Sequence, residues 1–285
     1  MTVNIHPTAV IEPGAELGVD VRVGPYTVIG PRVKVGDRTR IGAHVVLDGV
    51  TSIGVENIIV GQASIGGPPQ DLTYRGEPTE VILGDRNTVR EFVTINRGTV
   101  KGGGVTRIAD GSLLMSCCHI AHDCDLGSNL IIAGGVQLAG HTCIEDYANL
   151  SGMAGAVAFS TVGAHAYVGA KTRISRDVPP FMIVEGHDAR VRGVNVIGLQ
   201  RAGISEENIL SLRDAYRRLW RSSRPLAVAL EEIAATPDQT PEVAQLVASL
   251  QRTERGLKGR YRETLRAEFA AEGARRIAAK REQTA

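Results

Sequence analysis

The chain has 285 residues, and its 32 Lys and Arg against 31 Asp and Glu give a formal net charge of +1, which argues against general nucleic-acid binding. Glycine is frequent, with 33 residues, while Phe, Trp and Tyr together number only 11, so a core filled with aromatic side chains is excluded. No run of about 18 apolar residues predicts a membrane span, and the N-terminal residues lack a charged and then apolar secretory signal. We therefore expect a cytoplasmic protein.

An aliphatic residue recurs every six positions through the first part of the chain. The series runs from Ile5 to Ile65, resumes at Leu83, and after a slip of one residue continues from Ile108 to Ile174. A second series of small or β-branched residues follows each aliphatic by four positions. A period of six fits short strands joined by tight turns, whereas helices would repeat at about 3.6 residues.

The repeat predicts a parallel β-helix. Three strands of this length close a triangular coil of 18 residues, and coils stack at the strand spacing of about 4.8 Å. We expect this mainly β domain to cover residues 1–190. Two segments, 66–81 and 99–106, break the six-residue frame and should loop out from it. Insertions of this kind commonly carry the function of a repeat protein.

The remaining residues, 191–285, predict a C-terminal α-helical domain, because only 4 of the 33 glycines lie beyond residue 200. A helix is expected to begin at the capping residue Ser205 and to run toward Ser223. Further helices are expected over 225–235, 241–252 and 258–281. The segment 201–285 carries 16 Lys and Arg against 12 Asp and Glu, so it could meet an acidic partner.

Four cysteines, Cys117, Cys118, Cys124 and Cys143, form no Cys-x-x-Cys pair and show no disulfide-dense spacing. Reduced thiols in a cytosolic setting are therefore expected. Cys118 and Cys124 fall in the series of small residues, which indicates a packing role.

Three histidines gather near the middle of the predicted β-helix. With 18 residues per coil, His122 lies one coil below Gly140, so that His141 should lie beside it and His119 should be near. All three histidines fall outside the inward series, so we expect them to project outward and to be accessible. A histidine held on a rigid surface next to an acid, Asp123, suits a general base.

Several motifs occur in order along the chain, and both loops are among them. They are Gln70-Asp-Leu-Thr-Tyr-Arg-Gly-Glu-Pro-Thr, Gly84-Asp-Arg-Asn, Val93-Thr-Ile-Asn-Arg-Gly-Thr, Gly102-Gly-Gly-Val-Thr, His119-Ile-Ala-His-Asp-Cys, Leu138-Ala-Gly-His, Asp177-Val-Pro-Pro and Gly193-Val-Asn-Val-Ile-Gly-Leu-Gln-Arg. On these motifs, over about residues 5–220, the chain resembles the acyl-carrier-protein:UDP-N-acetylglucosamine O-acyltransferases, the first enzymes of lipid A synthesis.

The resemblance implies a left-handed β-helix that forms a homotrimer with three active sites, each between neighbouring subunits. It implies transfer of a (3-hydroxy)acyl chain from acyl carrier protein to the 3-position of a UDP-N-acetylglucosamine-type sugar nucleotide, with no cofactor and no metal. His122 would be the general base, Asp123 would orient its imidazole, and the backbone N–H of Gly140 would stabilise the oxyanion.

The same resemblance implies a set of substrate-binding residues. Those that would contact the acceptor sugar, the acyl donor or the nucleotide are Gln70, Asp71, His119, His141, Asn195 and Arg201. Ala170 falls where the family limits the length of the acyl chain, and a small residue there implies an open groove.

The chain departs from the family pattern at several positions. Thr73 stands where the family has Lys, Val157 and Ala158 replace a His-Gln pair, Ile197 replaces a Glu, and Asn96 replaces a His. Each loss removes hydrogen-bond partners worth roughly 0.5–3 kcal/mol. These departures keep open an alternative, a paralogue with another acceptor, for example a 3-amino sugar nucleotide, or without activity.

A zinc enzyme is a second alternative. Trimers that resemble γ-class carbonic anhydrases bind zinc through three histidines across a subunit boundary, and His119, His122 and His141 could supply them. The order of the two loops and the helical tail favours the acyltransferase.

Overall fold

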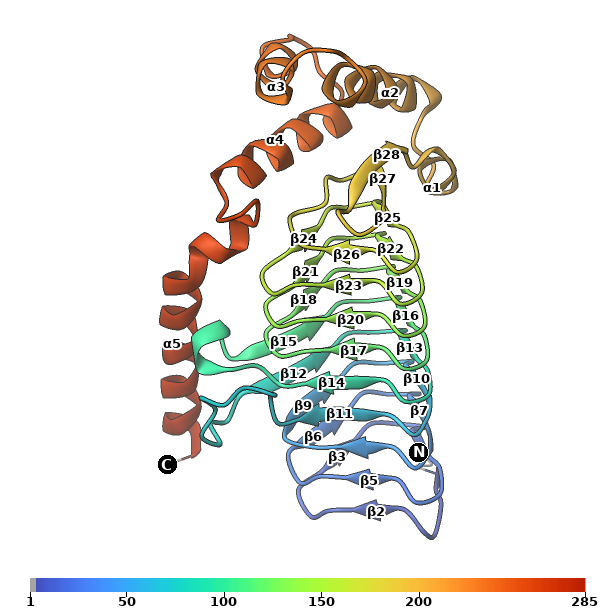
Figure 1. Cartoon of the computed structure of the whole chain (residues 1–285). Coiled ribbons are helices and arrows are strands. Elements are labelled where there is room, and N and C mark those ends of the chain that lie inside the picture. Colours follow the sequence, from blue (N-terminus) through green and yellow to red (C-terminus); the bar gives the residue numbers. More distant parts are fainter. Residues whose placement is uncertain (1–3, 285) are drawn as a thin grey trace.

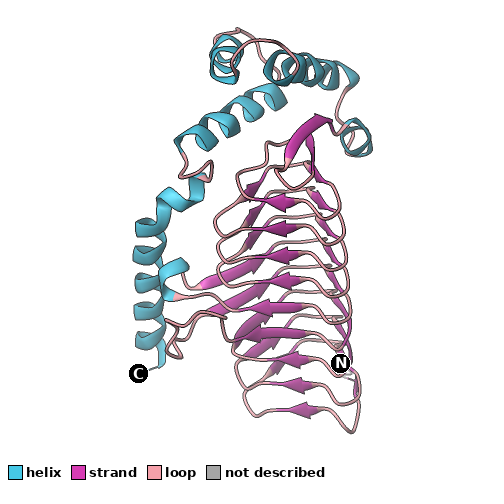
Figure 2. Ribbon diagram, viewed as in Figure 1, coloured by secondary structure: helices cyan, strands magenta, loops and turns pink. Residues whose placement is uncertain are grey.

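The computed structural model describes residues 4–284, and within them the chain forms three mainly parallel sheets that enclose a triangular prism, followed by helices (Figures 1 and 2). Residues 1–3 and 285, which belong to the two predicted domains, lie outside the described range. From β1 to β26 consecutive strands belong to different sheets, so the chain visits the three faces in turn.

Each face of the prism is one sheet. The 11-stranded sheet contains β1 (Asn4–Ile5), β4 (Arg22–Val23), β7 (Arg40–Ala43), β10 (Ile58–Gly61), β13 (Thr88–Val89), β16 (Leu113–Leu114), β19 (Ile131–Ile132), β22 (Asn149–Leu150), β25 (Tyr167–Val168), β27 (Met182–Glu185) and β28 (Arg190–Val194). The nine-stranded sheet contains β2 (Val10–Ile11), β5 (Val28–Ile29), β8 (Val46–Leu47), β11 (Ser64–Gly67), β14 (Thr94–Asn96), β17 (His119–Ile120), β20 (Gln137–Leu138), β23 (Gly155–Ala156) and β26 (Arg173–Ile174). The eight-stranded sheet contains β3 (Glu16–Leu17), β6 (Val33–Val35), β9 (Val50–Ile53), β12 (Glu80–Leu83), β15 (Val105–Ile108), β18 (Asp125–Leu126), β21 (Cys143–Ile144) and β24 (Thr161–Val162).

The register confirms the 18-residue coil. Ile5 pairs with Val23, and Ile120 pairs with Leu138, in parallel. Because the register repeats, the aliphatic series stacks on itself inside the prism, and its members from Val23 to Ile174 are almost completely buried. The small series is buried in the same core over most of its length, and Cys118 belongs to it, as predicted.

Both interruptions of the frame loop out from the prism. The first begins after β11, which ends at Gly67, and returns at β12. The second contains a short 3-10 helix, η1 (Val100–Gly102), before β15 begins at Val105. Because of the first insertion, the paired residues Ser64 and Thr94 are 30 positions apart rather than 18, and because of the second, Thr94 and His119 are 25 positions apart.

The tail folds into five α-helices among the described residues. They are α1 (Val196–Arg201), α2 (Glu206–Trp220), α3 (Leu226–Ala234), α4 (Pro241–Arg255) and α5 (Arg266–Thr284), with a 3-10 turn η2 (Tyr261–Leu265) before the last. Ser205 caps α2 as predicted, since its hydroxyl accepts from Asn208 N. The antiparallel pair of β27 and β28, and the helix α1, were not expected from the sequence. A second apolar cluster, centred on Phe181, Leu212 and Leu246, joins these helices to the end of the prism.

The two ends of the prism differ. In its first coil, β1, β2 and β3 are each the terminal strand of their sheet. Ile5 and Val10 in this coil are 40% and 52% exposed. The other end is covered by β27, β28 and the helices (Figure 1). The division between residues 190 and 191 stays a prediction, and β28 crosses it. None of the helices in residues 4–284 is long and apolar enough to cross a membrane.

Candidate active site

The histidine cluster arises directly from the 18-residue repeat. His122 and Gly140 occupy equivalent corner positions of successive coils, and Asp123, His141 and Phe159 occupy the next position of the same corner. The latter three have φ values of 62°, 64° and 66°, the left-handed conformation that turns the chain at this corner. Side chains of one corner column therefore stack along the prism axis.

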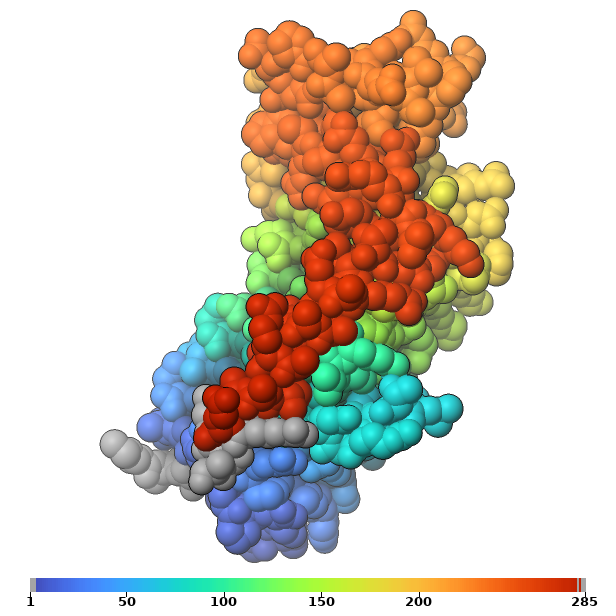
Figure 3. All heavy atoms as spheres, turned by 90° about the vertical axis from the view of Figure 1, so that its left-hand side faces the viewer, coloured from blue at the N-terminus to red at the C-terminus, as the bar shows by residue number. Residues whose placement is uncertain are grey.

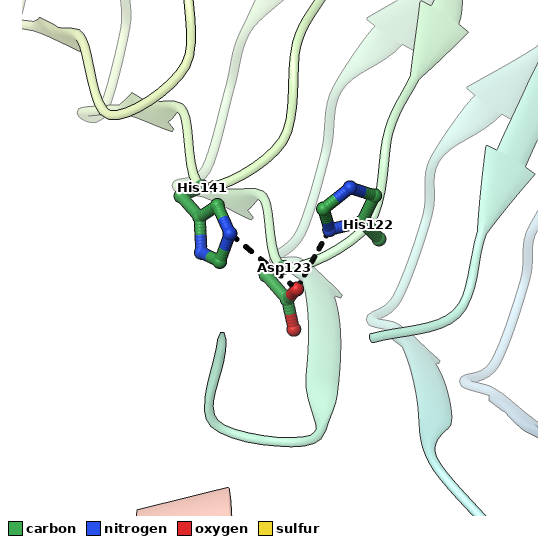
Figure 4. Close-up of side chains that lie close together, drawn as sticks. All are labelled: His122, Asp123 and His141. Carbon is green, nitrogen blue, oxygen red and sulfur yellow. Dashed lines mark hydrogen bonds and ion pairs between the residues drawn. The ribbon is translucent and has the colours of Figure 1, made fainter. Parts of the chain in front are cut away.

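His122 and Asp123 form a hydrogen-bonded pair (Figure 4). His122 Nδ1 lies 2.7 Å from Asp123 Oδ2, and the Asp123 side chain is fully buried. The same carboxylate accepts hydrogen bonds from the backbone N–H and the hydroxyl of Thr99, at 2.7 and 2.6 Å. A carboxylate with these partners holds the His122 proton on Nδ1, which leaves Nε2 as the basic nitrogen.

Asp71 lies opposite this basic nitrogen. Its Oδ2 is 4.0 Å from His122 Nε2 and 2.6 Å from Lys101 Nζ. Thr73 donates to Asp71 Oδ1 through its N–H and its hydroxyl, at 2.8 and 2.7 Å. Burial alone would raise the pKa of the Asp71 carboxyl, but the hydrogen bonds from Lys101 and Thr73 and the Lys101 charge hold this pKa well below its usual range.

His141 is buried, which corrects the expectation that all three histidines are accessible. It is only 6% exposed, because its ring stacks on Phe159 with the centroids 4.1 Å apart. The guanidinium of Arg266 lies 4.4 Å from the Phe159 ring centroid, and Arg262 Nε donates to His141 O at 3.2 Å. The C-terminal segment therefore covers this side of the cluster. Burial lowers the pKa of His141 to about 4, so it is neutral at pH 7.

His119 is held apart from the other two histidines. Its Nδ1 lies 2.7 Å from Thr94 Oγ1, and burial, with a smaller effect of His122, lowers its pKa. Within residues 4–284, the group whose ligand atoms lie within 4.8 Å of one another consists of His122, Asp123 and His141. Within residues 4–284 of one chain, the three histidines suggested for zinc therefore do not form such a group.

Two cavities border His122. The larger, of about 580 Å³, is lined by Gln70, His119, His122, Gly140, Val157 and Lys171, among others. The smaller, of about 300 Å³, is lined by Asp71, Lys101, His122, Gly140, His141, Ala158, Phe159, Arg266 and Ala270. His122 therefore lines both cavities.

Gly140 lies against the imidazole of His122. A Cβ at this position would lie 2.5 Å from His122 Cε1 and 2.9 Å from Nε2, so only glycine lets the ring approach so closely. Its neighbour His141 donates its backbone N–H to His122 O at 3.1 Å. The predicted adjacency of His122 and Gly140 is confirmed.

Three of the predicted binding residues line neither cavity. Asn195 caps α1 and donates from its amide to His165 O at 2.9 Å, and Arg201 is the last residue of that helix. Ala170 is exposed on the prism surface, one position before the cavity-lining Lys171. A single chain therefore does not bring these residues to His122.

The departures from the family pattern have different surroundings. Thr73 still binds Asp71, while Val157 and Ala158 line the two cavities as apolar walls. Ile197 is 64% exposed on α1. Asn96 is buried, and its side-chain oxygen has no hydrogen-bond partner within residues 4–284.

Sequence reasoning missed Thr99, Lys101, Phe159 and Arg266. Lys101 stands directly before the glycines of the 99–106 loop, and Phe159 follows His141 by 18 residues, so the loop and the coil period could have indicated both. Arg266 lies on α5, and no repeat relates this helix to the prism.

The fold and the dyad of His122 and Asp123 define a transferase of the hexapeptide-repeat class. The family described as "Bacterial transferase hexapeptide (six repeats)" matches residues 14–49. The family "Udp N-acetylglucosamine O-acyltransferase; Domain 2" matches residues 177–258. The predicted fold is confirmed: a parallel β-helix, as the repeat indicated, left-handed, as the family resemblance implied, and followed by helices.

Known proteins identify the family. Acyl-acyl-carrier-protein UDP-N-acetylglucosamine O-acyltransferases of Anaeromyxobacter dehalogenans and Paraburkholderia phymatum are 51% and 47% identical, and each alignment covers 89% of this chain and 98% of the relative. The UDP-N-acetylglucosamine acyltransferase structure of Francisella novicida is 35% identical with a TM-score of 0.83, covering 87% of this chain and 91% of its own. The corresponding Acinetobacter baumannii structure is 37% identical with a TM-score of 0.81, covering 87% and 96%. The chain belongs to the family of acyl-acyl-carrier-protein UDP-N-acetylglucosamine O-acyltransferases. These comparisons do not support the zinc enzyme or the paralogue with another acceptor.

Proposed function

We propose that the protein transfers a (3-hydroxy)acyl chain from acyl carrier protein to the 3-hydroxyl of UDP-N-acetylglucosamine, the first step of lipid A biosynthesis. The observation that carries this proposal is the dyad of His122 and Asp123, because His122 lines both cavities while its Nδ1 is held by Asp123. One cavity can admit the acyl thioester and the other the sugar nucleotide.

His122 acts as the general base in this reaction. Its Nε2 takes the proton of the sugar 3-hydroxyl while the sugar oxygen attacks the thioester carbonyl carbon. Asp123 stabilises the imidazolium that forms, because it accepts the Nδ1 proton at 2.7 Å. The tetrahedral intermediate then expels the carrier thiolate, and His122 returns the proton to that sulfur.

Gly140 and Asp71 hold the reactants. The backbone N–H of Gly140 donates to the oxyanion of the tetrahedral intermediate, and donors of this type contribute about 2.7–4 kcal/mol to transition-state stabilisation. The Asp71 carboxylate, ionised beside Lys101, accepts from an acceptor hydroxyl. Gln70, His119 and His141 contribute the surrounding contacts, and Ala170 leaves the acyl groove open.

We also propose that the active form is a homotrimer. Asn195 and Arg201, the residues expected to hold the nucleotide, do not line the cavities beside His122 in one chain. A neighbouring subunit would supply them, so that each site lies between two subunits. A cytoplasmic location accords with four free cysteines, two of which are buried.

Incubation of the purified protein with acyl carrier protein thioesters and UDP-N-acetylglucosamine tests the activity. Mass spectrometry should find the acylated sugar nucleotide together with free carrier thiol, and both should form about 10²–10⁴-fold more slowly with His122→Ala. Absence of product with thioesters of every chain length would refute the proposed function. Light scattering tests the assembly and should give about 91 kDa, three times the 30.3 kDa chain. A stable monomer would refute the shared site.

A further inference from the structure

The C-terminal helix α5 lies against η1, the short helix of the 99–106 loop (Figures 1 and 3). The contact is made at Gly273, which is buried. A Cβ on Gly273 would lie 1.8 Å from Val100 O and 3.2 Å from Gly103 N. Helix and loop therefore touch backbone to backbone, and any side chain at this position would push them apart.

Two ion pairs fix the helix beyond this contact. Arg276 Nη1 lies 3.0 Å from Glu80 Oε1, and Lys280 Nζ lies 2.6 Å from Glu80 Oε2. All three side chains are largely buried, at 28%, 23% and 13% exposed, so solvent screens these pairs only in part. Glu80 begins β12, and its N–H donates to Gly104 O at 3.0 Å. The helix is thereby attached to the prism at the base of the loop.

The loop that α5 contacts makes polar contacts with both carboxylates of the site, those of Asp123 and Asp71. Thr99 donates two hydrogen bonds to Asp123, and Lys101 pairs with Asp71 at 2.6 Å. Gly102 packs so closely on Asp123 that a Cβ there would lie 2.0 Å from its carboxyl carbon. A displacement of η1 would therefore move the hydrogen-bond donors that orient Asp123, and with it the His122 ring.

We propose that α5 positions the catalytic dyad through η1, and that Gly273, Arg276 and Lys280 are positioning residues of the acyl transfer. This inference rests on the proposed function, because its effect is on the rate of that reaction. None of the three residues lines the cavities beside His122. They act through a backbone contact that keeps Thr99 and Lys101 in place.

Gly273→Ala in the full chain tests the proposal. The added methyl group should displace η1, and misplacement of catalytic groups by about 1 Å can cost about 10²-fold in rate, so we expect kcat to fall at least tenfold. Gly193→Ala is the matched control, since a Cβ there meets no heavy atom within 4 Å, and it should leave kcat unchanged. Arg276→Gln combined with Lys280→Gln should lower kcat less, because the glycine contact remains.

A double-mutant cycle with Asp123→Asn separates positioning from a general loss of stability. If α5 acts through the Thr99 bonds to Asp123, Gly273→Ala should lower the residual rate of Asp123→Asn less than twofold, because coupled residues are not additive. The same loss in both backgrounds, or a wild-type rate for Gly273→Ala, would overturn the proposal. If Gly273→Ala does not fold, the Arg276 and Lys280 double substitution is carried through the same cycle, with the same criteria.

A second measurement does not depend on activity. In protein labelled with ¹⁵N-histidine, the His122 Nδ1 proton, hydrogen-bonded to Asp123, should give a downfield resonance. It should shift or broaden in Gly273→Ala and persist in Gly193→Ala. An unchanged resonance in Gly273→Ala would overturn the positioning role, whereas a wild-type protein that shows this resonance without acyl transfer would refute the proposed function instead.

Discussion

Gly140→Ala is the sharpest test of the site geometry, because the backbone N–H is kept and only a methyl group is added. That group would lie 2.5, 2.9 and 3.0 Å from Cε1, Nε2 and Nδ1 of His122. Ordinary contact requires about 3.4–4 Å, so the ring must move by about 1 Å. Such a shift breaks the 2.7 Å bond to Asp123 and should lower kcat about 10²-fold.

The assay for this prediction is steady-state acyl transfer, with melting temperature as a check on folding. Gly152→Ala is the control, because a Cβ there would meet only Gly134 O, at 3.5 Å. All three close contacts of a Cβ at Gly140 belong to the His122 ring. Gly140→Ala should therefore lower the melting temperature of the wild type but not that of His122→Ala. A kcat within twofold of the wild type would show that the ring does not lie where the structure has it.

Three further predictions concern single residues. His122→Ala should lose about 10²–10⁴-fold in kcat/KM while a melting curve shows that it is still folded at the assay temperature, and more than a tenth of the wild-type rate would exclude a general base. His141, with its pKa lowered from 6.5 to about 4, binds a proton more readily in the unfolded chain. The wild type should therefore lose about 3 kcal/mol of stability per subunit as the pH falls from about 6.5 to 4. His141→Phe should lose less stability over this range. If the stability of the two proteins fell equally with pH, the lowered pKa of His141 would be contradicted. Maleimide should label the exposed Cys117 and not Cys118, whose thiol is buried and has its pKa raised to about 11, and mass mapping that finds both modified would contradict this burial.

The β-helix and the core of the site could be predicted because the sequence is periodic. A residue in a regular coil has its neighbours 18 positions away, so the approach of His122 to Gly140 and the burial of Cys118 follow from counting. The same count explains the pairing of Ile120 with Leu138. Local signals also sufficed for α2, since Ser205 is a favourable N-cap.

The covering of the site could not be predicted in this way. The contacts of Arg266 with Phe159 and of Gly273 with Val100 join residues more than 100 positions apart, and no period relates them. These contacts depend on the path that the chain takes after the prism ends, and tertiary packing rather than local sequence determines that path. The expectation that His141 is accessible was wrong for two reasons. Phe159 stacks on its ring from the next coil, which the period could have indicated, and Arg262 and Arg266 contact this pair from the C-terminal segment, which no period relates to it.

The unequal ends of the prism have a consequence for how the protein comes apart. In a solenoid each coil is stabilised mainly by its neighbours, so opening proceeds from a free end. The coil of β1 to β3 has a neighbour on one side only, and its aliphatic residues Ile5 and Val10 are half-exposed. Amide hydrogen exchange should therefore be fastest there and slow progressively along the prism. Since the first coils can fray without moving His122, heat or denaturant would unravel that end while the catalytic coils still hold their shape.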